Sequence, residues 1–534
     1  MKQAVRRGRV LAKQSLVLGS TCAALLAFAC GGGSDGSTPA SADSNVALPD
    51  EPEPTPSGET PDVTPPDDVA PETPPAPDPS EPEPAEPDPT APVDPVEPPR
   101  RCDSSISFDD LYSDVAIDLN AEGDDGLFLR YVSLANRLNQ GICSEDLADD
   151  RFAVFKAVNS LSTEVQMHAP EPIDGESTLY RIDLREIGWD RPTVVDGVEF
   201  ADKWEALIAA SPYAVQFEGD DAEEAQLDSG TSVPVLFADA FIDAAMVDNL
   251  YYAMIEIGES EDELLEQLGI DEEEDVVLRV GTSNSRLSRQ DALAERFDQV
   301  GFQGYYWSRY DLAEDTGGQS VFADPLEFQA DSVGVVFSLK NGLNAYALFD
   351  GTGARITDTD VIVDATQRDG RVRNGVSCSQ CHAAGVLPMS DEVREYVAQN
   401  RRDFDADTLG ELEDTFLEQS EIDELIQNDG ALYSQALARA GIEVTGSDPI
   451  AATYVRFDGD VTLPAAAGEL GLTPAELERD LRFVAGRVDG SLSSLLTQGL
   501  RREQFDALYL ATLCVMQAVG DNRPLAADCA AVGQ

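Results

Sequence analysis

Residues 378–382 read Cys-Ser-Gln-Cys-His and hold the side chains with the most specific chemistry in this 534-residue chain. Two thiols separated by two residues match the two vinyl groups of haem, to which they add as thioethers. The histidine that follows places an imidazole beneath the iron as its proximal ligand. This CxxCH motif therefore predicts one haem c, held covalently by Cys378 and Cys381 and ligated by His382.

Three other uses of a Cys-x-x-Cys pair compete with haem. A thioredoxin-like pair opens a helix after a strand in a βαβ unit, and the residues around the motif do not show that pattern. A structural disulfide between cysteines three residues apart is strained and rare. A zinc site needs a second such pair or more histidines, and the chain has only His168 and His382. The same scarcity argues against a Ser-His-Asp triad.

The segment 374–382, Asn-Gly-Val-Ser-Cys-Ser-Gln-Cys-His, resembles the attachment site of bacterial c-type cytochromes. A wider similarity to large, exported, single-haem proteins rests on Tyr-Arg-Ile-Asp-Leu-Arg at 180–185, on Lys-Asn-Gly-Leu at 340–343 and on the motif itself. The resemblance implies haem binding and electron transfer, and it does not specify a reaction. Small soluble cytochromes c carry the motif near the start of the domain, whereas most of the folded part precedes it here.

The sixth ligand of the iron stays open at this stage. Small cytochromes c use a methionine some tens of residues downstream, but Met389 is the only methionine between His382 and Met516. Wrapping around the haem takes about 20 Å of chain, and the seven residues to Met389 span about 23 Å when extended. His168, the only other histidine, lies in a polar segment. The alternatives are His168, Met389, another methionine, or an open or water-bound position.

Two arginines directly precede the motif and are candidates for pairing with the haem propionates. The guanidinium groups of Arg371 and Arg373 match carboxylate geometry, and the alternative is a solvated turn. An aromatic run at 305–310 either walls the haem or belongs to the ordinary core. The acidic run at 271–275 lacks the spacing of a calcium loop and is predicted to be a solvated turn.

Residues 1–29 are predicted to be a lipoprotein signal peptide. A basic start precedes a short apolar stretch that ends in Leu-Ala-Phe-Ala before Cys30. The sequence resembles a lipobox, with Ala27 where leucine is usual, so we expect lipid on Cys30; the alternative is ordinary cleavage. Gly31 rather than aspartate follows the cysteine, which favours the outer membrane. The chain is thus expected in the cell envelope, on the periplasmic or the surface side.

A proline- and acid-rich stalk is predicted over residues 30–100. It holds most of the 32 prolines, and residues 35–97 contain no lysine or arginine. Such a segment cannot form a core, because proline restricts the backbone and the like charges repel each other. Extended polyproline II over some 60 residues would reach roughly 190 Å.

The folded part is predicted to be α+β, with the haem site between a mixed region over 101–370 and a helical region over 371–534. Helical spacing is seen over 124–162, with Ser144 as an N-cap. Strands are expected at 179–184, 304–310, 333–339 and 343–349, the last two joined by a hairpin turn at Asn341-Gly342. The residues Thr-Pro-Ala-Glu at 473–476 predict a capping box.

Four cysteines remain after the signal, lipid and haem cysteines are set aside: Cys102, Cys143, Cys514 and Cys529. Disulfides suit an oxidising envelope, and four cysteines allow three pairings. Neighbour pairing, Cys102 with Cys143 and Cys514 with Cys529, is preferred because it closes both ends of the folded region.

The net charge of −65 makes binding to nucleic acid a poor hypothesis. We expect the membrane to be reached through the lipid, and the partner to be a redox protein or a small electron donor or acceptor. An electron carrier is the first hypothesis. A haem-dependent oxidoreductase of the peroxidase or oxygenase kind, and a haem-based sensor or binding module, are the alternatives. The sequence names no catalytic acid or base.

Overall fold

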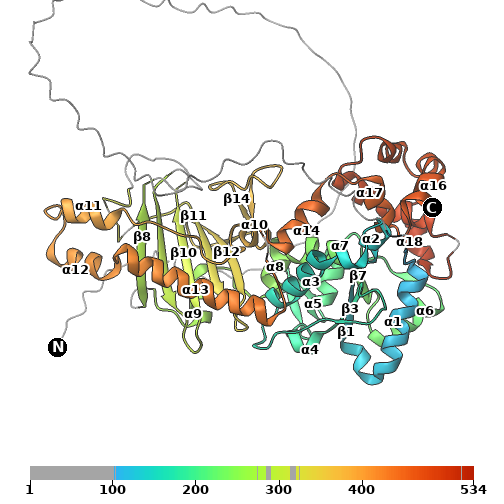
Figure 1. Cartoon of the computed structure of the whole chain (residues 1–534), viewed down its shortest axis with the longest axis horizontal. Coiled ribbons are helices and arrows are strands. Elements are labelled where there is room, and N and C mark those ends of the chain that lie inside the picture. Colours follow the sequence, from blue (N-terminus) through green and yellow to red (C-terminus); the bar gives the residue numbers. More distant parts are fainter. Residues whose placement is uncertain are drawn as a thin grey trace, which may run out of the picture. The chain divides into compact units, whose positions relative to one another are not determined.

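The structure is a computed structural model of the whole chain. In it, a six-stranded antiparallel sheet lies beside the segment that carries the CxxCH motif (Figure 1). Its strand order is β13-β12-β11-β10-β9-β8. The strands are β8 (Val276–Thr282), β9 (Ala292–Asp298), β10 (Tyr305–Asp311), β11 (Ser332–Ser338), β12 (Asn344–Asp350) and β13 (Arg355–Ile356). The structure describes residues 102, 104–272, 275–283, 290–312, 320–323, 325–326, 328–444, 446–518 and 520–533.

The strands expected at 304–310, 333–339 and 343–349 are confirmed as β10, β11 and β12, within one residue at each end. The hairpin between β11 and β12 turns at Asn341-Gly342, where Gly342 has φ +90°. That backbone conformation favours glycine, and the Gly342 N–H donates to the Leu339 carbonyl to close the turn.

One face of this sheet matters for the site. The register places Trp307, Val336 and Tyr346 side by side on β10, β11 and β12, and Arg309, Gly334 and Leu348 in the next row of the same face. Helix α13 (Gln419–Arg439) packs here, because its Asp429 accepts a 2.8 Å hydrogen bond from the Trp307 indole. We call this surface the α13 face; Figure 1 shows α13 running along the sheet.

The second sheet has the strand order β2-β3-β1-β7. Only β1 and β7 run parallel, while the other pairs are antiparallel. The strands are β1 (Leu129–Ser133), β2 (Glu171–Pro172), β3 (Leu179–Asp183) and β7 (Val235–Phe237). β3 confirms the strand expected at 179–184. Short pairs are formed by β4 (Thr193–Val195) with β5 (Val198–Phe200), β6 (Phe217–Glu218) with β16 (Arg523–Pro524), and β14 (Asp358–Thr359) with β15 (Val372–Arg373).

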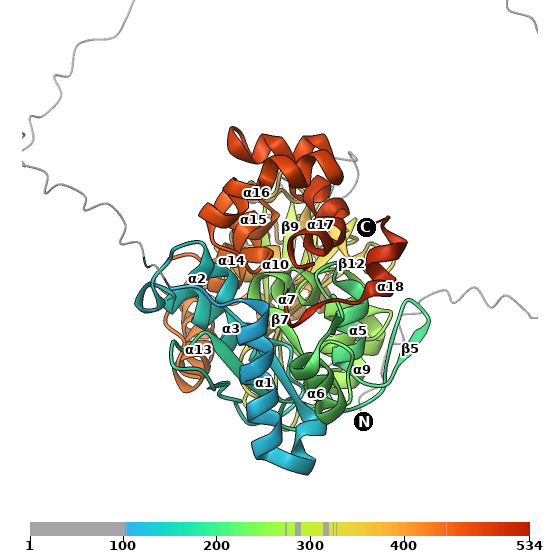
Figure 2. The ribbon, with the colours of Figure 1, turned by 90° about the vertical axis from the view of Figure 1, so that its right-hand side faces the viewer.

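The helices of the first half precede the larger sheet in the chain, and the last of them contacts that sheet through the Glu261–Tyr306 hydrogen bond. They are α1 (Phe108–Glu122), α2 (Ala135–Asn139), α3 (Ala148–Ser160), α4 (Leu184–Ile187), α5 (Lys203–Ala210), α6 (Asp220–Ser229), α7 (Ala238–Ala245), α8 (Asp248–Met254) and α9 (Glu261–Leu268), with 3₁₀ turns η1 (Gly123–Phe128) and η2 (Ser144–Asp146). Helix α1 begins with a capping box between Ser107 and Asp110, and it lies beside α6 (Figure 2).

Part of the helical prediction for 124–162 is wrong. Residues 129–133 form β1, in which all five residues are buried, and the leucines around it belong to η1, β1 and α2 in turn. Ser144 does not cap a helix with its side chain; it opens the turn η2, and α3 begins at Ala148. A strand buried on every residue has no polar alternation, so its apolar positions matched a helical period by coincidence.

The C-terminal part is helical, as expected. It contains α10 (Val376–Cys381), α11 (Val393–Gln399), α12 (Ala406–Thr415), α13, α14 (Pro449–Asp458), α15 (Leu463–Glu469), α16 (Pro474–Arg487), η3 (Gly490–Leu496), α17 (Arg502–Met516) and α18 (Ala526–Ala531). Thr473 caps α16 in the predicted capping box with Glu476, and Pro474 is the first helical residue. With two antiparallel-rich sheets before this region, the α+β class is confirmed.

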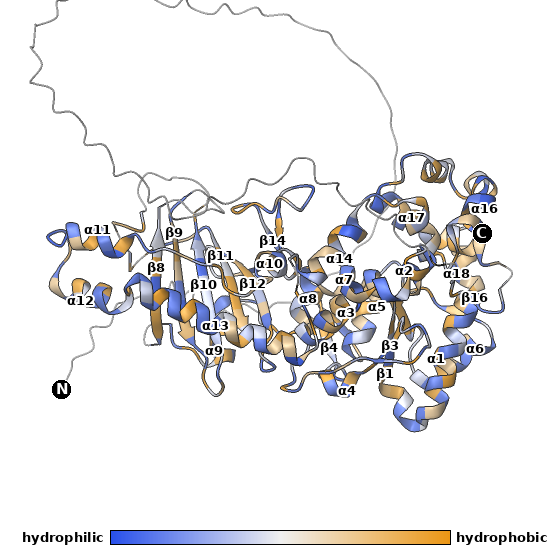
Figure 3. Ribbon diagram, viewed as in Figure 1, coloured by the Kyte–Doolittle hydropathy of each residue, from blue (hydrophilic) through white to orange (hydrophobic). Residues whose placement is uncertain are grey.

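The main core joins both sheets and the central helices. Its buried residues run from Val132 on β1 to Tyr454 on α14, so it crosses position 370 without a break. By its contacts, residues 94–534 form one compact unit. Apolar and polar residues alternate in stretches along the strands of the larger sheet, and β10 is mostly pale to blue (Figure 3). Within the described residues, no helix combines the length and apolar character needed to cross a bilayer. The predicted signal peptide, Cys30 and the stalk lie outside the described residues.

Candidate functional site

The CxxCH motif occupies α10 and the residue after it. Helix α10 begins behind Gly375, whose φ of +67° favours glycine. A β-carbon there would lie 2.3 Å from the Met246 carbonyl oxygen, so only glycine lets this turn approach the α7–α8 junction so closely. Asn374 fixes the same junction, because its side chain exchanges two 3.0 Å hydrogen bonds with the backbone of Asp248. The motif is thus held against α8.

The two thiols of the motif lie one helical turn apart on α10. Cys378 is partly buried and packs against the main core, whereas Cys381 is exposed. Both are free thiols. Burial raises the pKa of the Cys378 thiol to about 12. A redox pair of the thioredoxin kind depends on a lowered thiol pKa, so this environment does not favour that use of the motif.

The imidazole of His382 is oriented by a local contact. Its Nδ1 lies 3.1 Å from the carbonyl oxygen of Gly385, an acceptor that requires the proton on Nδ1. Nε2 then carries the lone pair, which is the arrangement of a metal-binding imidazole. Burial lowers the pKa of His382 to about 4, against the opposing effect of the Gly385 carbonyl. The ring is therefore neutral near pH 7, as iron ligation requires.

The loop after His382 packs on α13 and on the sheet. Gly385 has φ +102°, and a β-carbon on it would lie 3.3 Å from the Cα of Gly430 on α13. The ring of His382 lies over the α13 face, with its centroid 5.9 Å from that of Tyr346. The positive charge of Arg309, on the same face, adds to the lowering of the His382 pKa.

The donor set therefore fits a covalent haem. Two free thiols lie one turn apart, one of them open to solvent, and they precede a neutral imidazole with Nε2 available. Among the described residues, no cluster of three or more His, Cys, Asp or Glu side chains could hold a bare metal ion. Nothing in this arrangement requires a second metal site.

No family model, curated protein or solved structure matches this chain.

The arginines upstream of the motif are paired with aspartates. Arg371 forms ion pairs with Asp358 and with Asp360, the latter at 3.4 Å. Arg373 binds Asp369 at 2.9 Å. Arg373 belongs to the short strand β15, and Arg371 directly precedes it. Both side chains are about one third exposed. A haem propionate would have to share or displace these aspartates.

The two candidate distal ligands have different surroundings. His168 is buried between α3 and α4: its Nδ1 lies 2.6 Å from Glu186, and its backbone N–H donates to the Asn159 side chain. Its Nε2 is buried without a hydrogen-bond partner among the described residues, and none of its hydrogen bonds or ion pairs involves the motif. Met389 is partly buried at the edge of the main core, and its carbonyl accepts a hydrogen bond from Gln419.

The aromatic run at 305–310 is divided between the two faces of the sheet. Tyr305 and Trp307 belong to the α13 face. Tyr306 belongs to the opposite face, where its hydroxyl donates to Glu261 at 3.2 Å. Only Tyr305 and Trp307 therefore lie on the same side of the sheet as His382.

Three residues of the α13 face were not found from the sequence: Arg309, Gly334 and Tyr346. They come from β10, β11 and β12, and the predicted hairpin pairs the last two strands. No sequence signal linked that sheet to α10, because the contact joins residues far apart in the chain, such as Tyr346 and His382, whose numbers differ by 36.

The four remaining cysteines form two disulfides, Cys102–Cys143 and Cys514–Cys529. This is the neighbour pairing expected from the sequence. The pairing leaves only the two cysteines of the motif as free thiols among the described residues.

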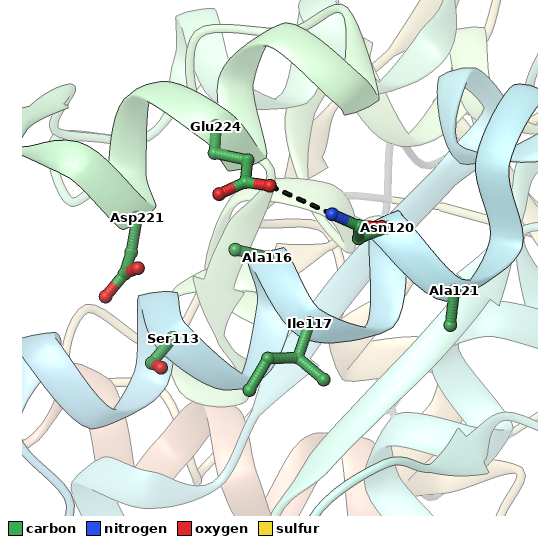
Figure 4. A pocket seen from close by; sticks show the side chains of 7 residues that line it. All are labelled: Ser113, Ala116, Ile117, Asn120, Ala121, Asp221 and Glu224. Atoms are coloured by element: carbon green, nitrogen blue, oxygen red, sulfur yellow. Dashed lines mark hydrogen bonds between the residues drawn. The ribbon is translucent and has the colours of Figure 1, made fainter.

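A surface hollow between α1 and α6 lies apart from the motif. Its volume is about 410 Å³. Figure 4 shows its lining, where Asn120 donates a 3.1 Å hydrogen bond to Glu224 above Ile117. None of its lining residues belongs to the motif or to the larger sheet, so it contributes nothing to the candidate haem site.

Proposed function

We propose that this chain is an exported, lipid-anchored protein of the bacterial cell envelope that carries one covalent haem c and transfers single electrons. Cys378 and Cys381 would form the thioethers, and His382 would be the proximal ligand. The observation that carries the proposal is the motif itself, with both thiols free and with Nδ1 of His382 directed at the Gly385 carbonyl.

Each part of the site has a role in that function. The haem would supply the one-electron couple. The two thioethers would keep it on the protein through repeated encounters with partners. The contact with Gly385 would fix the imidazole plane and increase its basicity as a ligand. Because Cys381 is exposed, one edge of the group would lie near solvent, where an electron donor or acceptor can approach.

The acidic surface limits the class of partner. A net charge of −65 favours partners with a basic docking surface, or small uncharged or cationic carriers, and it disfavours nucleic acid. The predicted stalk would let the folded part reach such partners at a distance from the membrane.

A second function, as a haem-dependent oxidoreductase or a haem-based sensor, is favoured by one observation. The hydroxyls of Tyr346 and Tyr433 are buried near each other, and neither makes a hydrogen bond of standard geometry with the described residues. Lys156, which is paired with the buried Asp448, lies 5.6 Å from the centroid of the Tyr433 ring. Such polar groups near a haem suit ligand binding as well as electron transfer.

The test is covalent haem content. The chain is expressed in a host with the haem c attachment machinery, and the haem is extracted with acidified acetone. We expect the haem to stay with the polypeptide in the wild type and to be absent from Cys378→Ala/Cys381→Ala. The matched control, Cys102→Ala/Cys143→Ala, removes a disulfide-bonded cysteine pair of the same chain and should keep covalent haem. Haem that is fully extractable from the wild type, or no haem at all, would refute the proposal.

A further inference from the structure

The α13 face, on which the His382 ring lies against Tyr346, is open above Gly334. Gly334 is partly exposed in the middle of β11, although its neighbours along the strand are buried. A β-carbon placed on Gly334 would meet only one atom within 4 Å, the Cδ2 of Leu348 at 4.0 Å. Glycine weakens a strand interior, and in this position it often marks a place where a ligand comes close to the backbone.

A fixed cation borders this opening. Arg309 pairs directly with Gly334 in the sheet register, so both face the same side. Its Nε and Nη2 bind the two oxygens of Asp311 at 2.9 and 3.0 Å. Asp311 is buried, while the arginine keeps about a quarter of its side-chain surface exposed. Nη1 has no partner among the described residues, so one side of the guanidinium fork is free to bind an anion.

The opening and the cation lie on the side of the CxxCH motif. The ring of Tyr346 lies 5.9 Å from that of His382. On β12, Tyr346 is two residues from Leu348 and faces the same side of the sheet. Leu348 is in turn the cross-strand partner of Gly334. Arg309 lies in the same row of this face as Gly334 and Leu348, one row from Tyr346. Cys378, in turn, lies near Tyr251 and Tyr252, whose hydroxyls accept from the β12 backbone at Tyr346 and Leu348.

We propose that the covalent haem lies on the α13 face over Gly334, with a propionate bound by Arg309. This inference rests on the proposed function and adds the place of the group and its main cation. Gly334 leaves room because it has no side chain, and Arg309 is held in position by Asp311. Arg371 and Arg373 are then not the principal propionate partners, since both Nη groups of each already bind aspartates, whereas only Nη2 of Arg309 does.

The first experiment uses Gly334→Val in two backgrounds. In the wild-type background, the valine side chain fills the opening, and we expect loss of most of the covalent haem. In the Cys378→Ala/Cys381→Ala background, which holds no covalent haem, the same substitution should leave the unfolding midpoint unchanged or raise it, because valine suits a strand better than glycine. A large fall of the midpoint in this background would show that the opening is structural, and the placement would be wrong.

The second experiment concerns the cation. Arg309→Gln should lower the midpoint potential of the haem and shift the propionate band in the resonance Raman spectrum. Arg309→Gln/Asp311→Asn should show the same Raman shift without leaving a buried carboxylate unpaired. Arg479→Gln removes an equal charge from the exposed surface of α16 and should change neither reading.

Two results would overturn the placement and leave the haem proposal intact. One is full covalent haem in Gly334→Val with an unchanged spectrum. The other is a Raman shift in Arg373→Gln that Arg309→Gln does not give. Absence of covalent haem from the wild type would instead refute the proposed function itself.

Discussion

The Nδ1 nitrogen of His382 lies 3.1 Å from the carbonyl oxygen of Gly385, three residues further along the chain. The backbone N–H of Gly385 also donates to the carbonyl of His382, so the four residues form a closed turn. That turn is held by α13, where Gly385 approaches Gly430. The orientation of the imidazole is therefore set partly by a glycine that does not touch the motif thiols.

Gly385→Ala should destabilise the folded chain and disturb the haem site. A non-glycine residue at φ +102° costs about 1 kcal/mol, and the added β-carbon must also displace α13. Urea unfolding measures the first effect, and the haem absorption spectrum measures the second. Gly441→Ala is the control, since it also has positive φ, at +69°, but open space around it. Equal losses in both variants would mean that the contact with α13 does not matter.

Sequence patterns predicted the strands, turns and helix caps that are determined by residues adjacent in the chain. The alternating strands at 304–310 and 343–349, the Asn341-Gly342 turn and the Thr473 capping box were all found because a few adjacent residues determine them. Strand β1 was missed because every one of its residues is buried. The motif was equally local, but Arg309, Gly334 and Tyr346 of the α13 face come from strands that are distant from it in the sequence. The approach of that face to His382 depends on core packing, for which no pattern in the sequence gives a signal.

The stability of the chain should fall as the pH rises from about 4.5 to 7 because of Glu261. Burial raises its pKa to about 7, and the nearby Glu272 acts in the same direction. In the unfolded chain the pKa returns to near 4.3, so the folded state holds the proton over this window. The stabilisation by the protonated Glu261 is fully present below the pKa of the unfolded chain. It is lost as the pH rises through the pKa of Glu261 in the folded chain. The full change is about 4 kcal/mol.

Glu261→Gln should remove that pH dependence and stabilise the chain at pH 8, because the amide can still accept from the Tyr306 hydroxyl. Urea unfolding at pH 5 and at pH 8 measures it. Glu266→Gln changes an exposed carboxylate on the same helix and should leave the pH profile as in the wild type. A Glu261→Gln profile identical to that of the wild type would contradict the assignment.

The two disulfides should stabilise the chain to different degrees. Cys514–Cys529 closes a loop of 15 residues, and Cys102–Cys143 closes one of 41. Loss of loop entropy in the unfolded chain gives about 3 kcal/mol for the shorter loop and about 4 kcal/mol for the longer one. Paired Cys→Ala variants and urea unfolding test this order. A larger loss from breaking the shorter loop would show that native packing, rather than loop length, decides the effect.

Cys30 should carry the lipid that attaches the chain to the membrane. Cys30→Ala is expected to move the protein from the membrane fraction to the soluble fraction of the cell envelope, because the stalk offers no other apolar anchor. Cys22→Ala, a change within the predicted signal peptide, should leave the protein in the membrane fraction. If the wild type and Cys30→Ala both fractionate as soluble, the lipobox interpretation is wrong.

The distal side of the iron should be weakly ligated or open. His168 binds Glu186 between α3 and α4, and its hydrogen bonds and ion pairs do not include the motif. Met389 could reach the far side of the haem only along an almost fully extended chain, with about 23 Å of extended backbone for a path of about 20 Å. The reduced protein should therefore bind CO at a measurable rate, and neither Met389→Ala nor His168→Ala should change that rate strongly. His382→Ala should lose the native spectrum altogether, because no other histidine lies nearby in the sequence.

A methionine-to-iron charge-transfer band together with resistance to CO would show a firm sixth ligand. If Met389→Ala then abolished that band, Met389 would be the ligand, and the chain would be a plain electron carrier with no position free for a substrate or a sensed gas.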